Sequence, residues 1–523
     1  MDIADPTLID LIARAAEAYP DHEAVVDEIS RYTYAELIDL ALRMGGMLRD
    51  RGVRPGDRVA LLSPTCAHHA IAVLGVMGMG AIPCSLHVRE SVETLAGVIE
   101  SIAPRLLIFD GLYEREARAL LDGSASLTGL VRLSSPLTPA QARASTGGEP
   151  LIPDDLAAFD PEPGFAPVEA DDVAAIVLSS GTTGLPKGIV HSHRTLAASA
   201  RNGMLYMVAD DQARGLNIFS TAFIGWYNCT FPFLCAGGRV VYRARWEPLD
   251  YLRAIETEGI TACILVPTMW RMLLKHAGRT DFGSLRRVGY VGEKIDLDTL
   301  RTIQSTVCAE VMNSYGATET GTWAGCTVML PEDYRATGKL DSIGRAARGV
   351  EVRIVEPGGP VDRLLPPGQE GELVISGPSV ASRIWGQPEV TRKKFDGKWW
   401  RSGDLGLMDA DGYIYLKGRS DDMIITGGIN VLPNVIEDAI RAHPAVAECV
   451  VLGMPCDQWG QKVTAFVQSR QALSEEELRG FVDRSGLAGY QKPRAYHFVD
   501  DIPRGNTGKI SRKQLMEQMR PLA

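Results

Sequence analysis

The feature that most constrains the fold is a repeated alternation between helical and strand patterns along the chain. The first run of this alternation is predicted at residues 33–52 (helix), 58–64 (strand), 92–104 (helix) and 105–111 (buried strand). The second run is predicted at residues 249–259 (helix), 260–268 (strand), 297–307 (helix) and 309–316 (strand). Strands that alternate with helices favour mostly parallel sheets covered by helices on both faces, so an α/β fold is expected.

The pattern changes twice in the last third of the chain. Short alternating strands with Gly and Pro turns follow Val350 and predict a small β subdomain over about 350–420. After Gly418 the pattern predicts, in order, a helix at 434–444, strands at 447–455 and 461–469, and a helix at 474–486. The expected architecture is therefore a large N-terminal domain of mostly parallel sheets flanked by helices, with that β subdomain, and a small α+β C-terminal domain.

Composition excludes several classes of function. A net charge of -11 disfavours nucleic acid and anionic membranes as partners. The most apolar stretch, 70–86, is interrupted by glycines and is expected to be a buried helix and a strand rather than a membrane span. The first ten residues lack a basic region, so no secretory signal is expected. The Pro- and Gly-rich segment 138–167 is expected to be a surface connector.

Cysteine and histidine usage gives little sign of a metal centre. The nine cysteines form no CxxC pair and are expected to be buried free thiols, which favours a cytoplasmic protein. His191 and His193 alternate as they would on one face of a strand. A polar strand edge is the expected interpretation, with a metal site as the weaker alternative.

A loop rich in Gly, Ser and Thr follows the buried strand pattern at 171–178. The stretch 178–193 reads "LSSGTTGLPKGIVHSH", and backbone N–H groups with hydroxyls at a strand end suit a phosphate. It is not a Walker A loop, because Lys187 stands between Pro186 and Gly188. A flexible polar turn is the alternative. The candidate phosphate-binding residues are Ser179, Ser180, Gly181, Thr182, Thr183, Gly184 and Lys187.

Four further stretches accompany this loop in a distinctive order. They are "NSYGATETG" (313–321), "WWRSGDLG" (399–406), "KGRSDDMIITGGINVLPNVIE" (417–437) and "PRGNTGKISRKQL" (503–515). In this order and spacing the chain closely resembles the adenylate-forming superfamily over nearly its whole length. That superfamily includes acyl- and aryl-CoA ligases, peptide-synthetase adenylation domains and luciferases. "GRSDDMIITGGIN" looks most like the CoA ligase branch.

The resemblance implies a two-step reaction that uses ATP, Mg²⁺ and CoA. A carboxylate attacks the α-phosphate of ATP, which releases pyrophosphate and leaves an acyl-adenylate. A thiol, usually that of CoA as co-substrate, then displaces AMP. Hydroxide is a poor leaving group and AMP a good one, so ATP cleavage drives thioester formation.

The resemblance also assigns roles in the first step. Thr182, Thr183 and Lys187 match a loop that closes over the β- and γ-phosphates, where negative charge must be neutralised. Glu319 matches a magnesium ligand, and Lys509 matches a lysine that contacts both the carboxylate and the α-phosphate. The expected catalytic residues are Lys509, Thr183, Glu319 and Lys187. The nucleotide is further expected to contact Tyr315 (adenine), Gly316, Thr318 (α-phosphate), Asp404 (ribose hydroxyls) and Arg419 (ribose or phosphate).

A change of domain orientation is implied between the two steps. Asp421 matches the hinge about which family members rotate the small domain, so domains of 1–420 and 421–523 are expected, the second of them mobile. Gly427 and Gly428 would lie on the face that serves thioester formation, where glycine lets the backbone approach the CoA pantetheine arm. A plain β-turn is the alternative for these two glycines.

The acid-binding segment departs from the family pattern. Ile224 follows Phe223 where amino-acid-activating domains usually carry an Asp, so an α-amino acid is disfavoured, and the usual histidine is absent. Local aromatic residues mostly pack cores, yet some are expected to line an acyl pocket for an apolar or aromatic acid. The expected pocket residues are Phe223, Ile224, Trp226, Tyr227, Gly292, Gly316 and Gly321.

Three functions remain open at this level. The main hypothesis is a CoA ligase whose partners are a small carboxylic acid, ATP and CoA. A carrier protein is the alternative acceptor, and it would be a separate chain because this one ends soon after Lys509. An enzyme specialised for one half-reaction is the third option. Nucleic acid and a membrane span are not expected, and the oligomeric state is left open, with a homodimer as one option.

Overall fold

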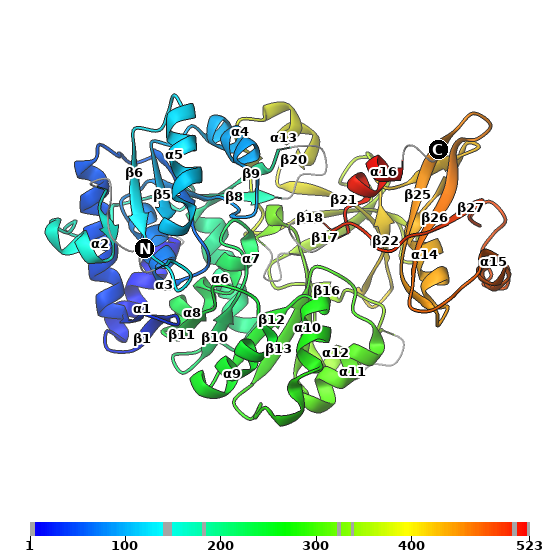
Figure 1. Cartoon of the computed structure of the whole chain (residues 1–523), viewed down its shortest axis with the longest axis horizontal. Helices are drawn as coiled ribbons and strands as arrows, with labels where there is room; N and C mark the ends of the chain where they lie inside the picture. Colours follow the sequence, from blue (N-terminus) through cyan, green and yellow to red (C-terminus); the bar gives the residue numbers. More distant parts are fainter. Residues whose placement is uncertain are drawn as a thin grey trace. The chain divides into compact units, whose positions relative to one another are not determined.

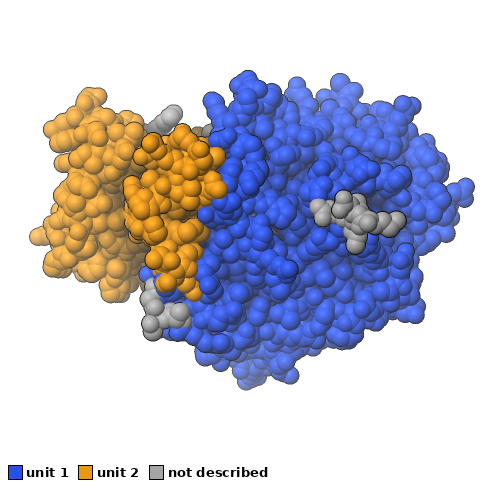
Figure 2. Space-filling view, turned by 180° about the vertical axis from the view of Figure 1, so that it is seen from behind, with its two compact units in different colours: residues 1–352, 375–400 blue, residues 353–374, 401–523 orange. Residues whose placement is uncertain are grey.

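A computed structural model of the whole chain describes residues 6–139, 149–179, 185–321, 326–335, 339–504 and 510–519. The chain divides into two compact units, coloured in Figure 2. Unit 1 comprises Met1–Val352 and Ile375–Trp400, and unit 2 comprises Arg353–Val374 and Arg401–Ala523. The boundaries cut through strands of the β subdomain, so a domain boundary at Asp421 stays a prediction.

A five-stranded parallel sheet forms the first layer of unit 1 (Figure 1). Its strands, in spatial order, are β4 (Ile82–Ser85), β3 (Arg58–Leu62), β5 (Leu106–Asp110), β6 (Gly129–Leu133) and β7 (Leu151–Ile152). Alternate residues of a strand face opposite sides, so Val59 and Leu61 pack toward α3 while Ala60 and Leu62 pack toward α4 and α5. The helices are α2 (Tyr34–Asp50), α3 (Ala67–Gly78), α4 (Val92–Ile102) and α5 (Glu114–Gly123).

A nine-stranded sheet forms the second layer. Its order is β16 (Arg345–Ala346), β15 (Thr327–Met329), β14 (Val311–Tyr315), β13 (Arg287–Val291), β12 (Ala262–Leu265), β10 (Arg214–Asn217), β11 (Arg239–Tyr242), β1 (Glu23–Val26) and β2 (Arg31–Thr33). The pairs from β1 through β11, β10, β12 and β13 to β14 are parallel, and the edge strands are antiparallel.

Helices cover both faces of this second sheet. The outer face carries α9 (Pro248–Glu258), α10 (Pro267–Leu274) and α11 (Leu297–Thr306), which bury Tyr251, Trp270 and Ile303 in one cluster. The opposite face packs on α1 (Leu8–Ala18), α6 (His193–Tyr206) and α8 (Phe231–Ala236). Residues of α1, α2, α3, α6 and α8 belong to one continuous hydrophobic cluster, so these helices fill the space between the two sheets.

Smaller elements complete unit 1. The strands β8 (Val173–Ser179), β9 (Lys187–Ser192) and β19 (Arg383–Ile384) form an antiparallel sheet. The remaining elements are α7 (Ile224–Asn228), α12 (Pro331–Arg335), α13 (Pro388–Lys394) and β20 (Phe395–Asp396).

Two sheets lie mainly in unit 2. The β subdomain has β17 (Glu351–Val355), β18 (Gly371–Ser376), β21 (Trp399–Met408) and β22 (Ile414–Arg419). The C-terminal sheet has β24 (Ile429–Val431), β23 (Ile424–Thr426), β26 (Gly460–Ser469) and β25 (Val446–Cys456), with β27 (Ala495–Phe498) parallel to β26. One face buries α14 (Pro433–Arg441) and α15 (Glu475–Asp483), and the other buries Leu515 of α16 (Arg512–Met519).

The α/β architecture with its β subdomain and α+β C-terminal region is confirmed. The stretch 70–86 forms the end of the buried helix α3 and strand β4, as expected. Two local expectations are wrong. The connector 138–167 contains β7, which joins the parallel sheet, because Leu151 and Ile152 are apolar enough to be buried at its edge. His193 begins helix α6, since Ser192 caps it through the Thr195 N–H, and both His191 and His193 are buried.

Candidate active site

The predicted phosphate loop connects two antiparallel strands. Ser179 ends β8 and pairs with Lys187 at the start of β9, and the Ser179 hydroxyl points to the Lys187 carbonyl oxygen at 3.5 Å. The loop is therefore a hairpin connection, with no helix directly after it of the kind a Walker A motif requires. Ser180, Gly181, Thr182, Thr183 and Gly184 lie outside the described residues.

The exit of this loop is held by close packing. A Cβ atom at Gly97 of α4 would lie 2.8 Å from Cδ1 of Leu185, so the missing side chain makes room for the leucine. A Cβ at Gly188 would lie 2.7 Å from Cγ2 of Ile176. The Gly188 carbonyl accepts a hydrogen bond of 2.8 Å from the Trp385 N–H. These contacts fix where β9 leaves the loop, and with it the position of Lys187.

Tyr315 ends β14, and a single 3₁₀ turn, Thr318–Thr320, follows it. Backbone carbonyls of this turn are held from three other segments. The Thr318 carbonyl lies 2.8 Å from Nε2 of His191 on β9, and the Glu319 carbonyl accepts the Ala381 N–H at 2.8 Å. The Ser199 hydroxyl on α6 donates to the Gly321 carbonyl at 2.5 Å. Glu319 thus projects from a clamped backbone.

The carboxylate of Glu319 fits a role as a magnesium ligand. Its residue is partly exposed, as Tyr315, Gly316 and Thr318 are, so the turn presents its side chains at a surface. Among the described residues, no group of three or more His, Cys, Asp or Glu side chains could hold a metal ion. Magnesium commonly takes one or two protein carboxylates and completes its octahedron with phosphate oxygens and water. A single clamped carboxylate is compatible with that arrangement.

Asp404 and Arg419 form a cross-strand ion pair in unit 2. They stand opposite each other in the antiparallel β21–β22 register, and Nη1 of Arg419 donates to Oδ1 of Asp404 at 2.8 Å. The Asp404 side chain is 14% exposed and that of Arg419 is 42% exposed. The pairing orients the Asp404 carboxylate across the two strands. Asp421 lies two residues beyond Arg419, is exposed, and approaches its guanidinium to 3.9 Å.

Gly427 and Gly428 form the tight turn of the β23–β24 hairpin. Thr426 pairs with Ile429, and both glycines have positive φ, at 57° and 80°. A two-residue turn of this kind favours glycine at both positions. Hairpin geometry alone therefore accounts for the two glycines, and their contact with CoA stays a prediction.

The segment that contains Lys509 is anchored at both ends. Lys509 itself lies outside the described residues, together with 505–508. An antiparallel bridge joins Arg504 to Ile510, and the Ser511 N–H donates to the Pro503 carbonyl at 2.8 Å. These bonds close the loop at its base, so the loop leaves and re-enters unit 2 at one place.

Arg512, two residues after Ile510, also holds this part of the chain in place. Its guanidinium donates to Oε1 of Glu437 at 2.7 Å and to the Val451 carbonyl at 2.9 Å. Glu437 is only 2% exposed and also accepts the Val451 N–H at 2.8 Å. Because the buried Glu437 carboxylate is paired with Arg512, removing Arg512 should lower the stability of unit 2.

The predicted acid-binding segment is mostly core. Trp226 is fully buried, stacks parallel to Tyr242 and meets His69 edge to face at 5.0 Å between ring centroids. Tyr227 is 2% exposed and Ile224 is 6% exposed. Phe223 is partly exposed and contacts the His87 ring at 5.0 Å. Gly321 is buried beside Ser379 and Gly292 is exposed. The contact of these residues with an acid stays a prediction.

Three histidines of unit 1, His69, His191 and His193, are buried, and their burial was not predicted from the sequence. Burial lowers the pKa of His69 to about 3, and its ring bridges the hydroxyls of Ser63 at 2.7 Å and Ser85 at 3.1 Å. Burial likewise lowers the pKa of His191 to about 4 and that of His193 to about 4. All three rings are therefore neutral near pH 7, and those of His69 and His191 act as hydrogen-bonding groups rather than cations.

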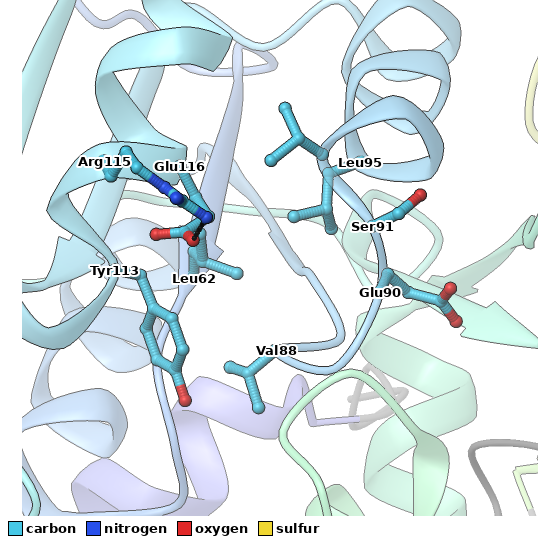
Figure 3. A pocket seen from close by; sticks show the side chains of 9 residues that line it. Leu62, Val88, Glu90, Ser91, Leu95, Tyr113, Arg115 and Glu116 are labelled. Carbon is cyan, nitrogen blue, oxygen red and sulfur yellow. Dashed lines mark hydrogen bonds and ion pairs between the residues drawn. The ribbon is translucent and has the colours of Figure 1, made fainter.

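A cavity of about 220 Å³ opens at the carboxyl ends of β3 and β5 in unit 1 (Figure 3). Leu62, Val88, Leu95 and Tyr113 provide its apolar lining. Glu90 and Ser91 project from the start of α4, opposite Arg115 and Glu116 (Figure 3). None of the residues predicted from the sequence lines this cavity. Within the described ranges, no helix is long and apolar enough to cross a membrane.

An acidic turn, a hydroxyl-rich loop sequence and an Asp–Arg pair are the features expected of a nucleotide-dependent, adenylate-forming enzyme. Comparison with known proteins gives the same class. The AMP-binding enzyme family matches residues 12–385, and the AMP-binding enzyme C-terminal domain matches residues 435–509. The chain belongs to the AMP-binding enzyme family, and the expected membership of the adenylate-forming superfamily is confirmed.

Individual relatives cover the whole length of the chain. A feruloyl-CoA synthase of Amycolatopsis sp is 31% identical over 95% of this chain and 96% of the relative. A fatty acid–[acyl-carrier-protein] ligase of Streptomyces coeruleorubidus is 30% identical over 98% of this chain and 96% of the relative. The crystal structure of ATP-bound MatB from Rhodopseudomonas palustris superposes with a TM-score of 0.86 at 26% identity, covering 98% of this chain and 99% of that one.

Proposed function

We propose that this protein is an ATP-dependent ligase that activates an apolar or aromatic carboxylic acid as its adenylate and transfers the acyl group to the thiol of CoA. The observation that carries the proposal is the turn Thr318–Thr320, whose clamped backbone presents Glu319 in a chain that matches the AMP-binding enzyme family over residues 12–385 and its C-terminal domain over residues 435–509. The acid class rests on the apolar residues around Phe223 and on Ile224, which offers no charge to an α-ammonium group.

The residues of unit 1 bind and neutralise the triphosphate. Lys187 and the hydroxyls of Thr182 and Thr183 donate to the β- and γ-phosphate oxygens, where charge develops as pyrophosphate departs. Glu319 would hold magnesium, which would supply positive charge to neutralise the phosphates. Tyr315 lies against the adenine, and Thr318 donates its hydroxyl to the α-phosphate.

The residues of unit 2 complete the nucleotide site. Asp404 accepts hydrogen bonds from the two ribose hydroxyls, and its ion pair with Arg419 keeps the carboxylate oriented for that diol. Lys509 donates to the acid carboxylate and to the α-phosphate, so one ammonium brings two anions together for attack. After adenylation, rotation at Asp421 carries Lys509 away and brings Gly427 and Gly428 to the thiol.

A carrier protein is the competing acceptor. The relative from Streptomyces coeruleorubidus is named as an acyl-carrier-protein ligase, while the relative from Amycolatopsis sp is named as a CoA synthase, at nearly equal identity. The stretch "GRSDDMIITGGIN" favours CoA because it looks most like the CoA ligase branch.

The acceptor is tested by AMP release with a panel of aryl and alkyl acids, ATP and magnesium. The proposal predicts AMP release that depends on both an acid and CoA. AMP release that requires a phosphopantetheinylated carrier protein and ignores CoA would replace CoA by the carrier as the acceptor. Pyrophosphate release without any acyl transfer to either thiol would leave only the first half-reaction.

A further inference from the structure

His191 makes two hydrogen bonds inside unit 1, and one of them reaches the turn that carries Glu319. Its Nε2 lies 2.8 Å from the carbonyl oxygen of Thr318, and its Nδ1 lies 3.1 Å from the hydroxyl of Thr195 on α6. The residue is fully buried at the end of β9. A ring at this depth has no water to satisfy its nitrogens, so these two partners set its state.

The partners determine which nitrogen carries the proton. A carbonyl oxygen can only accept, so Nε2 must be protonated and donate to Thr318. The ring is neutral, so Nδ1 carries no proton and lies 3.1 Å from the Thr195 hydroxyl, which also lies 3.0 Å from the Ser192 carbonyl and shares its one proton between these two acceptors. Thr195 is itself fixed by the first turn of α6, where its N–H bonds to the Ser192 hydroxyl at 3.2 Å. A chain of hydrogen bonds thus runs from a rigid helix, through the ring, to the turn.

The other anchors of the turn do not duplicate this one. The Ala381 N–H holds the Glu319 carbonyl and the Ser199 hydroxyl holds the Gly321 carbonyl. Of these three anchors from other segments, His191 is the one that bonds the first residue of the 3₁₀ turn; within the turn the Thr318 carbonyl also accepts the Gly321 N–H at 3.2 Å. Freeing that end would let the peptide between Thr318 and Glu319 rotate, which moves both the Thr318 hydroxyl and the Glu319 carboxylate.

We propose that His191 is a positioning residue for the nucleotide site, which fixes Thr318 and Glu319 through the Thr318 carbonyl without touching the nucleotide itself. This inference rests on the proposed function, because Glu319 matters to ATP only if it meets magnesium. The required feature is an N–H donor at the position of Nε2. Charge and ring shape are not required.

Two substitutions of similar size distinguish the effect of losing the N–H donor from the effect of changed packing. Gln and Met have nearly the same length and shape, but only Gln places an N–H near the position of Nε2. His191→Met should weaken binding of Mg·ATP about 10-fold and raise the magnesium concentration for half-maximal ATP binding, because the Thr318 carbonyl loses its bond to β9 and retains the Gly321 N–H of its own turn, so the turn is held less firmly. His191→Gln should remain within about 3-fold of the wild type.

The measurement is calorimetric titration of the full chain with ATP at fixed magnesium, then with magnesium at fixed ATP, in the absence of any acid. Melting temperatures of the two variants are recorded alongside. Equal affinities of the Met and Gln variants, whether wild-type or reduced, would overturn the inference, since packing alone would explain them. A wild type that does not bind Mg·ATP at all would instead remove the proposed function.

A second pair keeps the inference testable if changes at the ring prevent folding. Thr195→Val removes the hydroxyl that lies against Nδ1 of His191, and Thr195→Ser retains it. Val should weaken Mg·ATP binding by about 3-fold while Ser stays close to the wild type. Identical affinities of Val and Ser would contradict the chain of hydrogen bonds described above.

Discussion

Glu319 and Asp404 look alike in the sequence, as carboxylates in Gly-containing stretches, but the structure holds them in different ways. Glu319 is positioned by its backbone, whose flanking carbonyls are bonded to β9, α6 and Ala381. Asp404 is positioned by its side chain, which pairs with Arg419 across two strands. The backbone contacts fix where Glu319 leaves the turn, and the ion pair fixes the orientation of the Asp404 carboxylate.

Removing the charge of Glu319 should therefore affect the magnesium-dependent step. Glu319→Gln should slow acid-dependent pyrophosphate exchange by about 100-fold or more, because a cation contact at the reacting phosphates is lost. Excess magnesium should recover part of the rate. The matched control is Glu332→Gln, an exposed carboxylate on α12, which should exchange at the wild-type rate. Equal rates for Glu319→Gln and Glu332→Gln would exclude the metal role.

Lys509 is expected to serve only the first half-reaction. Lys509→Ala should reduce adenylation about 100-fold or more while thioester formation from a supplied acyl-adenylate stays near the wild-type rate. Lys513→Ala, an exposed lysine four positions further on, is the control and should leave both half-reactions unchanged. The two steps are measured separately, by pyrophosphate exchange and by CoA-dependent AMP release. Loss of both steps in the Lys509 variant would refute the assigned role.

At the scale of elements, Arg512 ties the start of α16 to α14 and β25, beside the segment that carries Lys509. Arg512→Met keeps the apolar stem but leaves Glu437 with only Arg441 as a charged partner. We expect a loss of about 3 kcal/mol in the unfolding free energy of unit 2, and a larger loss in adenylation than in thioester formation. Arg479→Met, whose partner Glu475 is half exposed, is the control and should change stability by less than about 1 kcal/mol.

Chemical denaturation followed by circular dichroism gives the stability, and the two half-reaction assays give the activity. An Arg512 variant as stable as the Arg479 variant would show that the Glu437 contact does not anchor the C-terminal segment.

The sequence predicts elements better than it predicts the contacts between them. Periodicity placed α2, α4, α9, α11 and α14 and the strands between them because each has an apolar face or a buried run of its own. Ser474, followed three residues later by Glu477, is a pattern typical of a helix start. The structure shows one of the two bonds of that pattern at α15, because the Ser474 hydroxyl accepts the Glu477 N–H at 3.2 Å.

The long-range contacts that hold the Thr318–Thr320 turn could not be predicted from the sequence. His191, Ser199 and Ala381 converge on one turn from segments more than 50 residues away from it, and no local pattern marks them. His191 was expected at a polar strand edge because alternation alone cannot tell a solvent-facing side from a buried one. The catalytic motifs were found because their residue types and order are distinctive, whereas the groups that hold them in place are ordinary.

At the scale of the whole molecule, unit 1 is built around one hydrophobic layer between two sheets, with neutral imidazoles inside or beside it. Unfolding exposes His69, His191 and His193, whose pKa values in the folded state are about 3, about 4 and about 4. The folded values lie below the unfolded value of about 6.5, so the unfolded state binds more protons as pH falls. The stability these rings contribute is present above about pH 6.5 and is lost as pH decreases toward the folded values.

We therefore expect unit 1 to lose stability on acidification before most carboxylates titrate. At about pH 5 each of the three rings should lower the free energy of unfolding of unit 1 by about 2 kcal/mol relative to pH 7.5. Urea denaturation followed by tryptophan fluorescence at both pH values measures the change. A midpoint that is the same at pH 5 and pH 7.5 would contradict the burial of neutral imidazoles. In His191→Gln the loss of stability between pH 7.5 and pH 5 should be smaller, because one titrating ring is removed.

The central claim is that this chain joins an organic acid to AMP at the expense of ATP. Acid-dependent exchange of labelled pyrophosphate into ATP, measured on purified wild-type protein with magnesium and a panel of aryl and alkyl acids, tests it most directly. The account predicts exchange that requires an acid and magnesium, is greatest with an apolar or aromatic acid, and proceeds without CoA. No exchange with any acid, in a protein that is folded and binds Mg·ATP, would contradict it.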